Sequence, residues 1–164
     1  MPGLAPAEAR ARFAASRIAR LATADAAGRP HLVPVVFVVD GDRVAMAVDH
    51  KPKRSPRLKR LANIRANPAV CLLADAYDED WDRLWWVRAD GSARVLPPAA
   101  ETVAEPAAET VAGSAAEPAA PDAAASARWT ELLAAKYPRQ YTGRHPEGEV
   151  VEIAVTAWTG WRAT

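Results

Sequence analysis

The stretch from His50 to Asn67 holds the residues that best suit chemistry with an anion. It contains seven Lys or Arg side chains, and no Asp or Glu occurs between Asp49 and Asp75. The whole chain carries 21 basic and 20 acidic residues, so this positive charge is a local concentration. A field of this kind favours a single anion over a long polyanion. The basic residues are Lys51, Lys53, Arg54, Arg57, Lys59, Arg60 and Arg65.

A helix is predicted inside this stretch. Ser55 is a suitable N-cap, and Pro56 suits the first helical position, where its missing N–H costs nothing. Apolar residues follow at helical spacing and leave Arg57, Lys59 and Arg60 near the helix start. Free backbone N–H groups and the helix dipole attract negative charge there. The residues alone leave two interpretations open, a phosphate-binding helix start and a solvated basic face.

The sequence offers no recognisable catalytic motif. It contains no dinucleotide-binding glycine fingerprint, P-loop, nucleophile elbow or zinc-protease motif. The histidines His31, His50 and His145 are scattered, and Asp49 and His50 would face opposite ways in a strand. The acidic segment Asp75 to Asp82 lacks the glycine and the terminal glutamate of an EF-hand loop. We therefore expect no catalytic residue and no metal site, and a cofactor must supply any chemistry.

Length and composition predict one cytoplasmic domain that spans residues 1–164. No apolar run reaches the ~18–20 residues of a membrane-spanning helix, and the N-terminus lacks the apolar centre of a signal peptide. The single cysteine, Cys71, cannot form an internal disulfide. A nucleic-acid partner is not expected, because the net charge is only +1 and the acidic segment would repel a duplex.

The apolar pattern predicts short strands joined by hairpins, with a few inserted helices. This order favours an antiparallel barrel or sandwich, and Pro34 favours an edge position or a bulge in its strand. Asp90-Gly91 is predicted to be a hairpin turn. Residues 97–125 are rich in Ala and Pro, lack large apolar side chains and are predicted to form a flexible or partly helical insertion. The predicted helices are Pro6–Ser16, the one capped by Ser55 and Ser126–Lys136, and the predicted strands are Ile18–Ala24, Pro30–Val39, Arg43–Val48, Ala69–Ala74, Leu84–Ala89, Ser92–Leu96 and Val150–Trp158.

Six tryptophans are many for a chain of this length. Trp129, on a predicted helix, is expected in the core. Trp85 and Trp86 are neighbours in a predicted strand, so they point to opposite faces. One of them belongs to the interior, and the other needs a partner surface or a ligand ring to cover it.

Several segments resemble a known family. ATADAAGRPHLVPVVF, AVDHKPKR and LKRLANIRANPAVCLL resemble the split-barrel flavin and deazaflavin family typified by pyridoxamine 5′-phosphate oxidase. DAYDEDWDRLWWVRADGSARV and the terminal WTGW are similar to an actinobacterial branch of that family described as coenzyme F420-dependent oxidoreductases. The resemblance covers about residues 5–95 and 129–161.

The resemblance implies a mainly β fold, a six-stranded antiparallel split barrel that forms a homodimer with two cofactor sites between the subunits. It implies hydride transfer between coenzyme F420 and a small enone or quinone acceptor. The alternatives are an FMN-binding flavoprotein of the same fold and a non-catalytic F420 or flavin carrier. The C-terminal Trp- and Arg-containing signature of true pyridoxamine phosphate oxidases is not present, which argues against oxidation of vitamin B6.

The resemblance also implies a set of cofactor-binding residues. Lys59 and Arg60 match the family's phosphate-binding pair, and Arg57 and Asn63 resemble further contacts to the phosphate or the ribityl chain. Trp86, or the terminal Trp158 and Trp161, would close the site from the partner subunit. The strand that borders the ring and the strand end beneath it contribute His31, Leu32, Val33, Pro34, Val48, Asp49, His50 and Lys51. Residue chemistry does not separate F420 from FMN, because both present a phosphate to the same pair.

Overall fold

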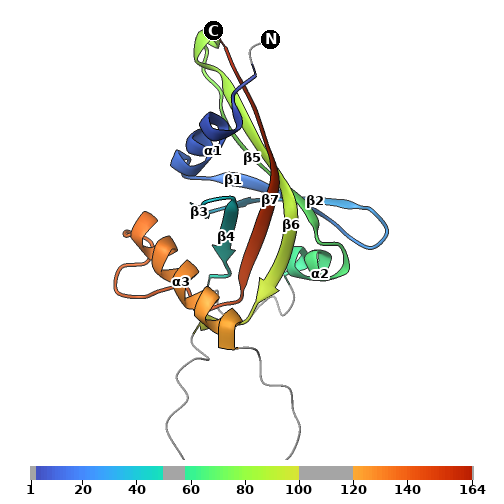
Figure 1. Ribbon diagram of the computed structural model, residues 1–164, viewed down its shortest axis with the longest axis vertical. Coiled ribbons are helices and arrows are strands. Elements are labelled where there is room, and N and C mark those ends of the chain that lie inside the picture. Colours follow the sequence, from blue (N-terminus) through green and yellow to red (C-terminus); the bar gives the residue numbers. More distant parts are fainter. Residues whose placement is uncertain (1–2, 50–57, 100–119, 164) are drawn as a thin grey trace, which may run out of the picture.

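The computed structural model describes residues 3–49, 58–99 and 120–163, which form one curled sheet with helices packed against it (Figure 1). The α-helices are α1 (Pro6–Ala15), α2 (Lys59–Ala66) and α3 (Ala120–Lys136), and a 3₁₀ turn, η1, spans Trp81–Arg83. The strands are β1 (Ala19–Ala24), β2 (Pro30–Val35), β3 (Val38–Asp40), β4 (Arg43–Ala47), β5 (Ala69–Ala76), β6 (Trp85–Leu96) and β7 (Val150–Arg162).

The sheet is antiparallel, and its strand order is β2-β1-β5-β6-β7-β4-β3. β2 and β3 lie at opposite ends of this order, yet only Val36 and Phe37 separate them in the chain. Such a link spans about 10 Å at most, at ~3.3–3.6 Å per residue. The sheet must therefore curl until its two ends approach, which produces a split barrel.

The number of strands differs from the expected six. The part of the chain that the structure describes has seven strands, and the sheet is not closed. Six is the number that the resemblance implies, whereas the sequence pattern predicts seven. Pro30–Val39 divides into β2 and β3, and the two predicted strands Leu84–Ala89 and Ser92–Leu96 form the single strand β6. Phe37, at the division, is fully buried, and its backbone N–H and C=O both bond the hydroxyl of Tyr137. The prediction that Pro34 belongs to an edge strand is confirmed, because β2 ends the sheet.

The predicted hairpin at Asp90-Gly91 is wrong. β6 runs unbroken through both residues, and the register with β7 shifts there, as at a β-bulge. A Cβ on Gly91 would lie 2.4 Å from the carbonyl oxygen of Ala154. Glycine is needed here because a neighbouring strand approaches closely, and no turn is formed.

Two helix starts differ from the predicted ones. α2 begins at Lys59 with Leu58 at the N-cap position, whereas the predicted cap, Ser55, and Pro56 lie outside the described residues. α3 begins at Ala120, so the last part of the predicted insertion is helical. Residues 100–119 are outside the described residues, and the assignment of the chain to one domain stays a prediction.

The core fills the concave side of the curled sheet. Phe13 from α1 and Leu61 and Ile64 from α2 join the buried strand residues in one cluster. α3 packs on the opposite face of β4 and β7, where Trp129, whose predicted core position is confirmed, and Leu133 form a second cluster. Among the described helices, none has the length and apolar character needed to cross a membrane.

Tyr137 provides the first test of this architecture. We expect Tyr137→Phe to lower the free energy of unfolding by about 1–3 kcal/mol, because the buried N–H of Phe37 loses its acceptor. Urea denaturation monitored by fluorescence measures the change. Tyr77→Phe is the matched control, because Tyr77 is 78% exposed, and it should change stability by less than about 0.5 kcal/mol. Equal stability of the two variants would contradict the assigned role of Tyr137.

Candidate functional site: the basic start of α2

The first turn of α2 presents cations beside free backbone N–H groups. Leu58, at the N-cap position, is extended, and no side chain caps the helix among the described residues. Lys59 and Arg60 open the helix, and its first turn contains no acidic residue. Free N–H groups and positive side chains at one helix end form an arrangement suited to phosphate.

Arg60 has an unsatisfied donor. Its Nε atom is buried and has no hydrogen-bond partner within the described part of the chain. Burial lowers the pKa of Arg60, while the nearby Asp49 carboxylate acts in the opposite direction. The side chain nevertheless stays a cation, because an arginine does not lose its proton in a protein. A buried donor without a partner is costly, so a bound anionic oxygen would relieve that cost.

Asp49 lies near Arg60, two residues after the end of β4, and is held by Tyr141. The Tyr141 hydroxyl donates to Asp49 Oδ1 at 2.9 Å. Burial raises the pKa of Tyr141, and the bond to the carboxylate raises it further, so the hydroxyl remains a donor. No local sequence pattern indicates a role for Tyr141. Its loop precedes β7, which pairs with β4, and this pairing brings the loop close to the end of β4, where Asp49 lies.

The predicted residues of β2 divide between its two faces. His31 lies opposite Thr23 of β1 and is half-buried, and its Nδ1 atom is buried without a partner among the described residues. Val33 is half-buried and packs against the core. Leu32 and Pro34 are exposed on the convex face. Only His31 and Val33 therefore point toward the side that α2 covers.

Asn63 and Val48 are engaged in contacts within the fold. Asn63 is only 3% exposed, and its amide donates to Thr23 Oγ1 at 3.0 Å. This bond joins α2 to β1 next to His31. Val48 is half-buried, and its N–H donates to the carbonyl oxygen of Glu149 at 2.9 Å. Both residues position the site.

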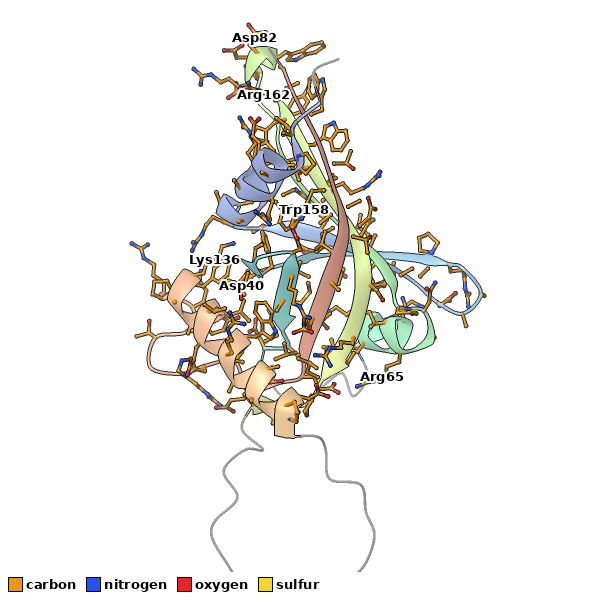
Figure 2. The ribbon with its side chains drawn as sticks, viewed as in Figure 1. Asp40, Arg65, Asp82, Lys136, Trp158 and Arg162 are labelled. Atoms are coloured by element: carbon orange, nitrogen blue, oxygen red, sulfur yellow. The ribbon has the colours of Figure 1, made fainter. Side chains whose placement is uncertain are left out.

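Trp86 lies at the other end of the sheet. It is paired with Trp161 on β7 and with Asp75 on β5. Pro68, just after α2, accepts a hydrogen bond from Ala93, which is about 20 Å further along β6 at ~3.3 Å per residue. In Figure 2, Arg65 of α2 and Arg162 of β7 lie toward opposite ends of the molecule. The structure does not bring Trp86 to α2 of its own chain.

The structure thus brings five predicted residues together around α2, namely His31, Asp49, Lys59, Arg60 and Asn63. The predicted site residues His50, Lys51 and Arg57 lie outside the described residues. Within ranges 3–49, 58–99 and 120–163, no group of three or more His, Cys, Asp or Glu is placed to hold a metal ion. The chemistry that this arrangement offers is binding of an anion.

Comparison with known proteins agrees with this fold. A family model described as "Pyridoxamine 5'-phosphate oxidase" matches residues 5–162. No curated protein matches the sequence. An FAD-binding protein from Mesorhizobium loti is similar in structure, with 17% identity, a TM-score of 0.64, and coverage of 97% of this chain and 95% of that one.

Two further solved structures are similar. An FAD-binding protein from Mycobacterium smegmatis has 21% identity and a TM-score of 0.57, covering 99% of this chain and 98% of its own. HutZ, the heme storage protein from Vibrio cholerae, has 13% identity and a TM-score of 0.60, covering 97% of this chain and 95% of its own. At these identities the likeness shows a shared fold.

The different burial of Asn63 and Lys59 leads to a prediction. Asn63→Ala should lower the free energy of unfolding by about 1–3 kcal/mol, because the buried Thr23 hydroxyl loses its partner. Lys59→Ala should change it by no more than about 0.5 kcal/mol, because that side chain is exposed. Paired urea titrations measure both. A larger loss for Lys59→Ala than for Asn63→Ala would reverse the assignment of the two roles.

Proposed function

The chain belongs to the pyridoxamine 5′-phosphate oxidase family, and from that premise we propose that it holds a flavin or deazaflavin cofactor by its phosphate at the start of α2. The observation that carries this proposal is the buried, unpartnered Nε of Arg60. It lies beside exposed Lys59 on a helix start without a side-chain cap. Phosphate oxygens are strong acceptors for such donors.

The residues present fit such a group. Arg60 and Lys59 would bind the phosphate, and the His31 end of β2 would border the ring. Asp49, which accepts from Tyr141, lies near Arg60, but no ion pair joins the two among the described residues, so the guanidinium would keep its donors for the phosphate. A bound cofactor of this class supplies hydride transfer, so the protein need only position it and the acceptor.

We propose an F420-dependent oxidoreductase that acts on a small enone or quinone acceptor as the first candidate, on the strength of the sequence resemblance to that branch. A flavoprotein is the second candidate, and two structural relatives named as FAD-binding proteins favour it. A non-catalytic carrier is the third. A relative named as a heme storage protein supports it, because that protein uses the same fold to hold a ligand.

We further propose that the protein is a homodimer joined through the convex face of the sheet. Residues opposite one another in antiparallel strands share a face. Leu73 lies between Arg20 and Arg88 on this face, and Trp86 lies opposite Trp161. Leu32 and Leu73 are 65% and 37% exposed, so this face leaves two large apolar side chains open to solvent. A second copy would cover it and could carry its Trp86 to the cofactor.

The phosphate assignment is tested by two ligands that differ only in that group. In the Lys59→Ala, Arg60→Ala double variant, FMN should bind about 100-fold more weakly or worse, because two charge-assisted contacts are lost. Riboflavin, which lacks the phosphate, should bind parent and variant about equally. Quenching of tryptophan fluorescence measures both affinities, and unchanged circular dichroism serves as the folding control. An FMN affinity equal to the parent's would refute the assignment.

The parent protein also decides between the candidate cofactors. Tighter binding of F420 than of FMN would favour the reductase and justify a screen of electrophilic acceptors with reduced F420. Preference for FMN would favour the flavoprotein, and tight binding without turnover of any acceptor would favour the carrier. Binding of neither cofactor would refute all three candidates.

The dimer proposal predicts that Leu73→Arg produces a monomer. Arg20 and Arg88 beside Leu73 already have carboxylate partners, so a further cation at this position would be buried without a partner at the interface, which is costly. Sedimentation velocity over a range of concentrations measures the mass. Ala135→Arg, at an exposed position of α3, is the matched control and should remain dimeric. A dimer for Leu73→Arg would place the interface elsewhere.

A further inference from the structure

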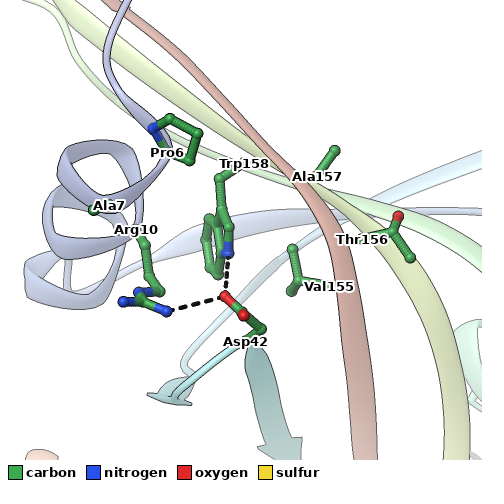
Figure 3. A pocket seen from close by; sticks show the side chains of 8 residues that line it. All are labelled: Pro6, Ala7, Arg10, Asp42, Val155, Thr156, Ala157 and Trp158. Carbon is green, nitrogen blue, oxygen red and sulfur yellow. Dashed lines mark hydrogen bonds and ion pairs between the residues drawn. The ribbon is translucent and has the colours of Figure 1, made fainter.

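A pocket of about 450 Å³ lies on the other side of the sheet from the convex face (Figure 3). It opens between the first turns of α1, the β3–β4 turn and the middle of β7. Its walls are mostly apolar and are formed by Pro6, Ala7, Val155, Ala157 and the indole of Trp158. The volume lies in the range of small-molecule sites, roughly 300–1,000 Å³.

The polar edge of this pocket is an ion pair with one unused oxygen. Trp158 Nε1 donates to Asp42 Oδ1 at 3.0 Å, and Arg10 Nη1 donates to the same oxygen at 3.1 Å (Figure 3). The bonds from Trp158 and Arg10 lower the pKa of Asp42, so the carboxylate stays ionised. No residue that the structure describes donates to Oδ2. The pocket therefore offers one free carboxylate oxygen beside the remaining N–H groups of a guanidinium.

The pocket is separate from the basic start of α2 in the same chain. Trp158 lies opposite Ala89, which is fully buried, and its indole meets the ring of Phe13 edge-on at 5.4 Å between centroids. The indole thus lies on the core side of β7, whereas Trp161 lies on the convex side with Trp86. Figure 1 shows α1 and α2 at separate places along the curled sheet, α1 near the chain termini and α2 near the opposite end of β6.

The charges and hydrogen-bonding groups of Asp42 and Arg10 together limit the class of ligand that the pocket can bind. A simple anion would be repelled by Asp42, and a simple cation would be repelled by Arg10. A neutral ligand that carries one donor next to one acceptor satisfies both groups and keeps their ion pair. Apolar walls with an indole favour a flat ring. An amide within a ring has this combination, because its N–H and C=O are forced to lie on the same side.

We propose that this pocket binds a flat heterocyclic amide, with the ring N–H donating to Asp42 Oδ2 and the ring carbonyl accepting from Arg10. The site is independent of the proposed cofactor site. It provides a place for a substrate or effector of the lactam class.

Isoquinolin-1(2H)-one is a suitable probe, and its N-methyl derivative is a matched control that lacks only the N–H. Binding to the full chain is followed by the indole N–H signals of ¹⁵N-labelled tryptophan, of which six are expected. Trp158→Phe identifies the Trp158 signal. The lactam should shift this signal, and the N-methyl derivative should bind about tenfold more weakly or worse, because a hydrogen bond to a charged group is lost.

Asp42→Asn tests the acceptor itself. Trp158 and Arg10 would hold the Asn carbonyl in the place of Oδ1, so its NH₂ would face the ligand as a donor. The lactam should then bind at least tenfold more weakly. Glu131→Gln, which removes the same charge from an exposed position of α3, should leave binding unchanged.

Three results would overturn the proposal. They are equal affinities for the lactam and its N-methyl derivative, an unchanged affinity in Asp42→Asn, and a Trp158 signal that the lactam does not move. Displacement of the bound lactam by FMN would also overturn it, because the pocket would then belong to the cofactor site. Failure of FMN and F420 to bind would refute the proposed cofactor site and leave the lactam result standing.

Discussion

The fold depends on the short link that joins the two ends of the sheet. The chain passes from β2 at one end to β3 at the other through Val36 and Phe37 alone. Phe37 is therefore buried where no strand can pair with it. The Tyr137 hydroxyl accepts from its N–H at 3.0 Å and donates toward its carbonyl oxygen at 2.8 Å. One side chain thus satisfies two backbone groups that the curled sheet would otherwise leave unpaired.

The two hydrogen bonds between Tyr137 and Phe37 also determine where the residues after α3 lie. Tyr137 follows the last residue of α3, and Trp129 of the same helix donates to the buried carboxylate of Glu152 on β7 at 2.7 Å. Arg43 of β4 and Arg94 of β6 bond that carboxylate too. With α3 fixed at both points, the following loop reaches the end of β4, where Tyr141 meets Asp49. The packing of a distant helix thereby sets the surroundings of Arg60.

Sequence patterns predicted those features that depend on local chemistry. The alternation of apolar residues located most strands, Pro34 predicted an edge, and the basic run predicted an anion-binding helix start. The errors arose where tertiary contacts override a local signal. Asp90-Gly91 has a typical turn sequence, yet β5 and β7 flank β6 on both sides there, and pairing across the sheet keeps the chain extended. Phe37 has strand propensity but lies on the link between the sheet ends.

The candidate site likewise contains residues that local chemistry identifies and residues that only tertiary contacts reveal. Lys59 and Arg60 were identifiable because their charges are adjacent in the chain. Asn63 resembled a ligand contact by its position in a motif, but its partner Thr23 is 40 residues away in sequence and gives it a buried bond. Tyr141 bonds a residue 92 positions away, and no local pattern could indicate that contact. The position of Trp86 in a strand was predictable from the sequence. Its distance from α2 was not, because that distance depends on the register between β6 and β7.

The distribution of ion pairs explains why the start of α2 differs from the rest of this nearly neutral chain. Arg10, Arg20 and Arg94 each bond a carboxylate directly, and most other described arginines do so as well. Arg60 is half-buried and has no such bond among the described residues, while its Nε stays unpaired. A fold that pairs most of its described arginines with carboxylates but leaves the half-buried Arg60 unpaired carries that cost unless an anion binds there. The strongest case for phosphate at this site is therefore the unsatisfied donor of Arg60, and the number of basic residues adds little to it.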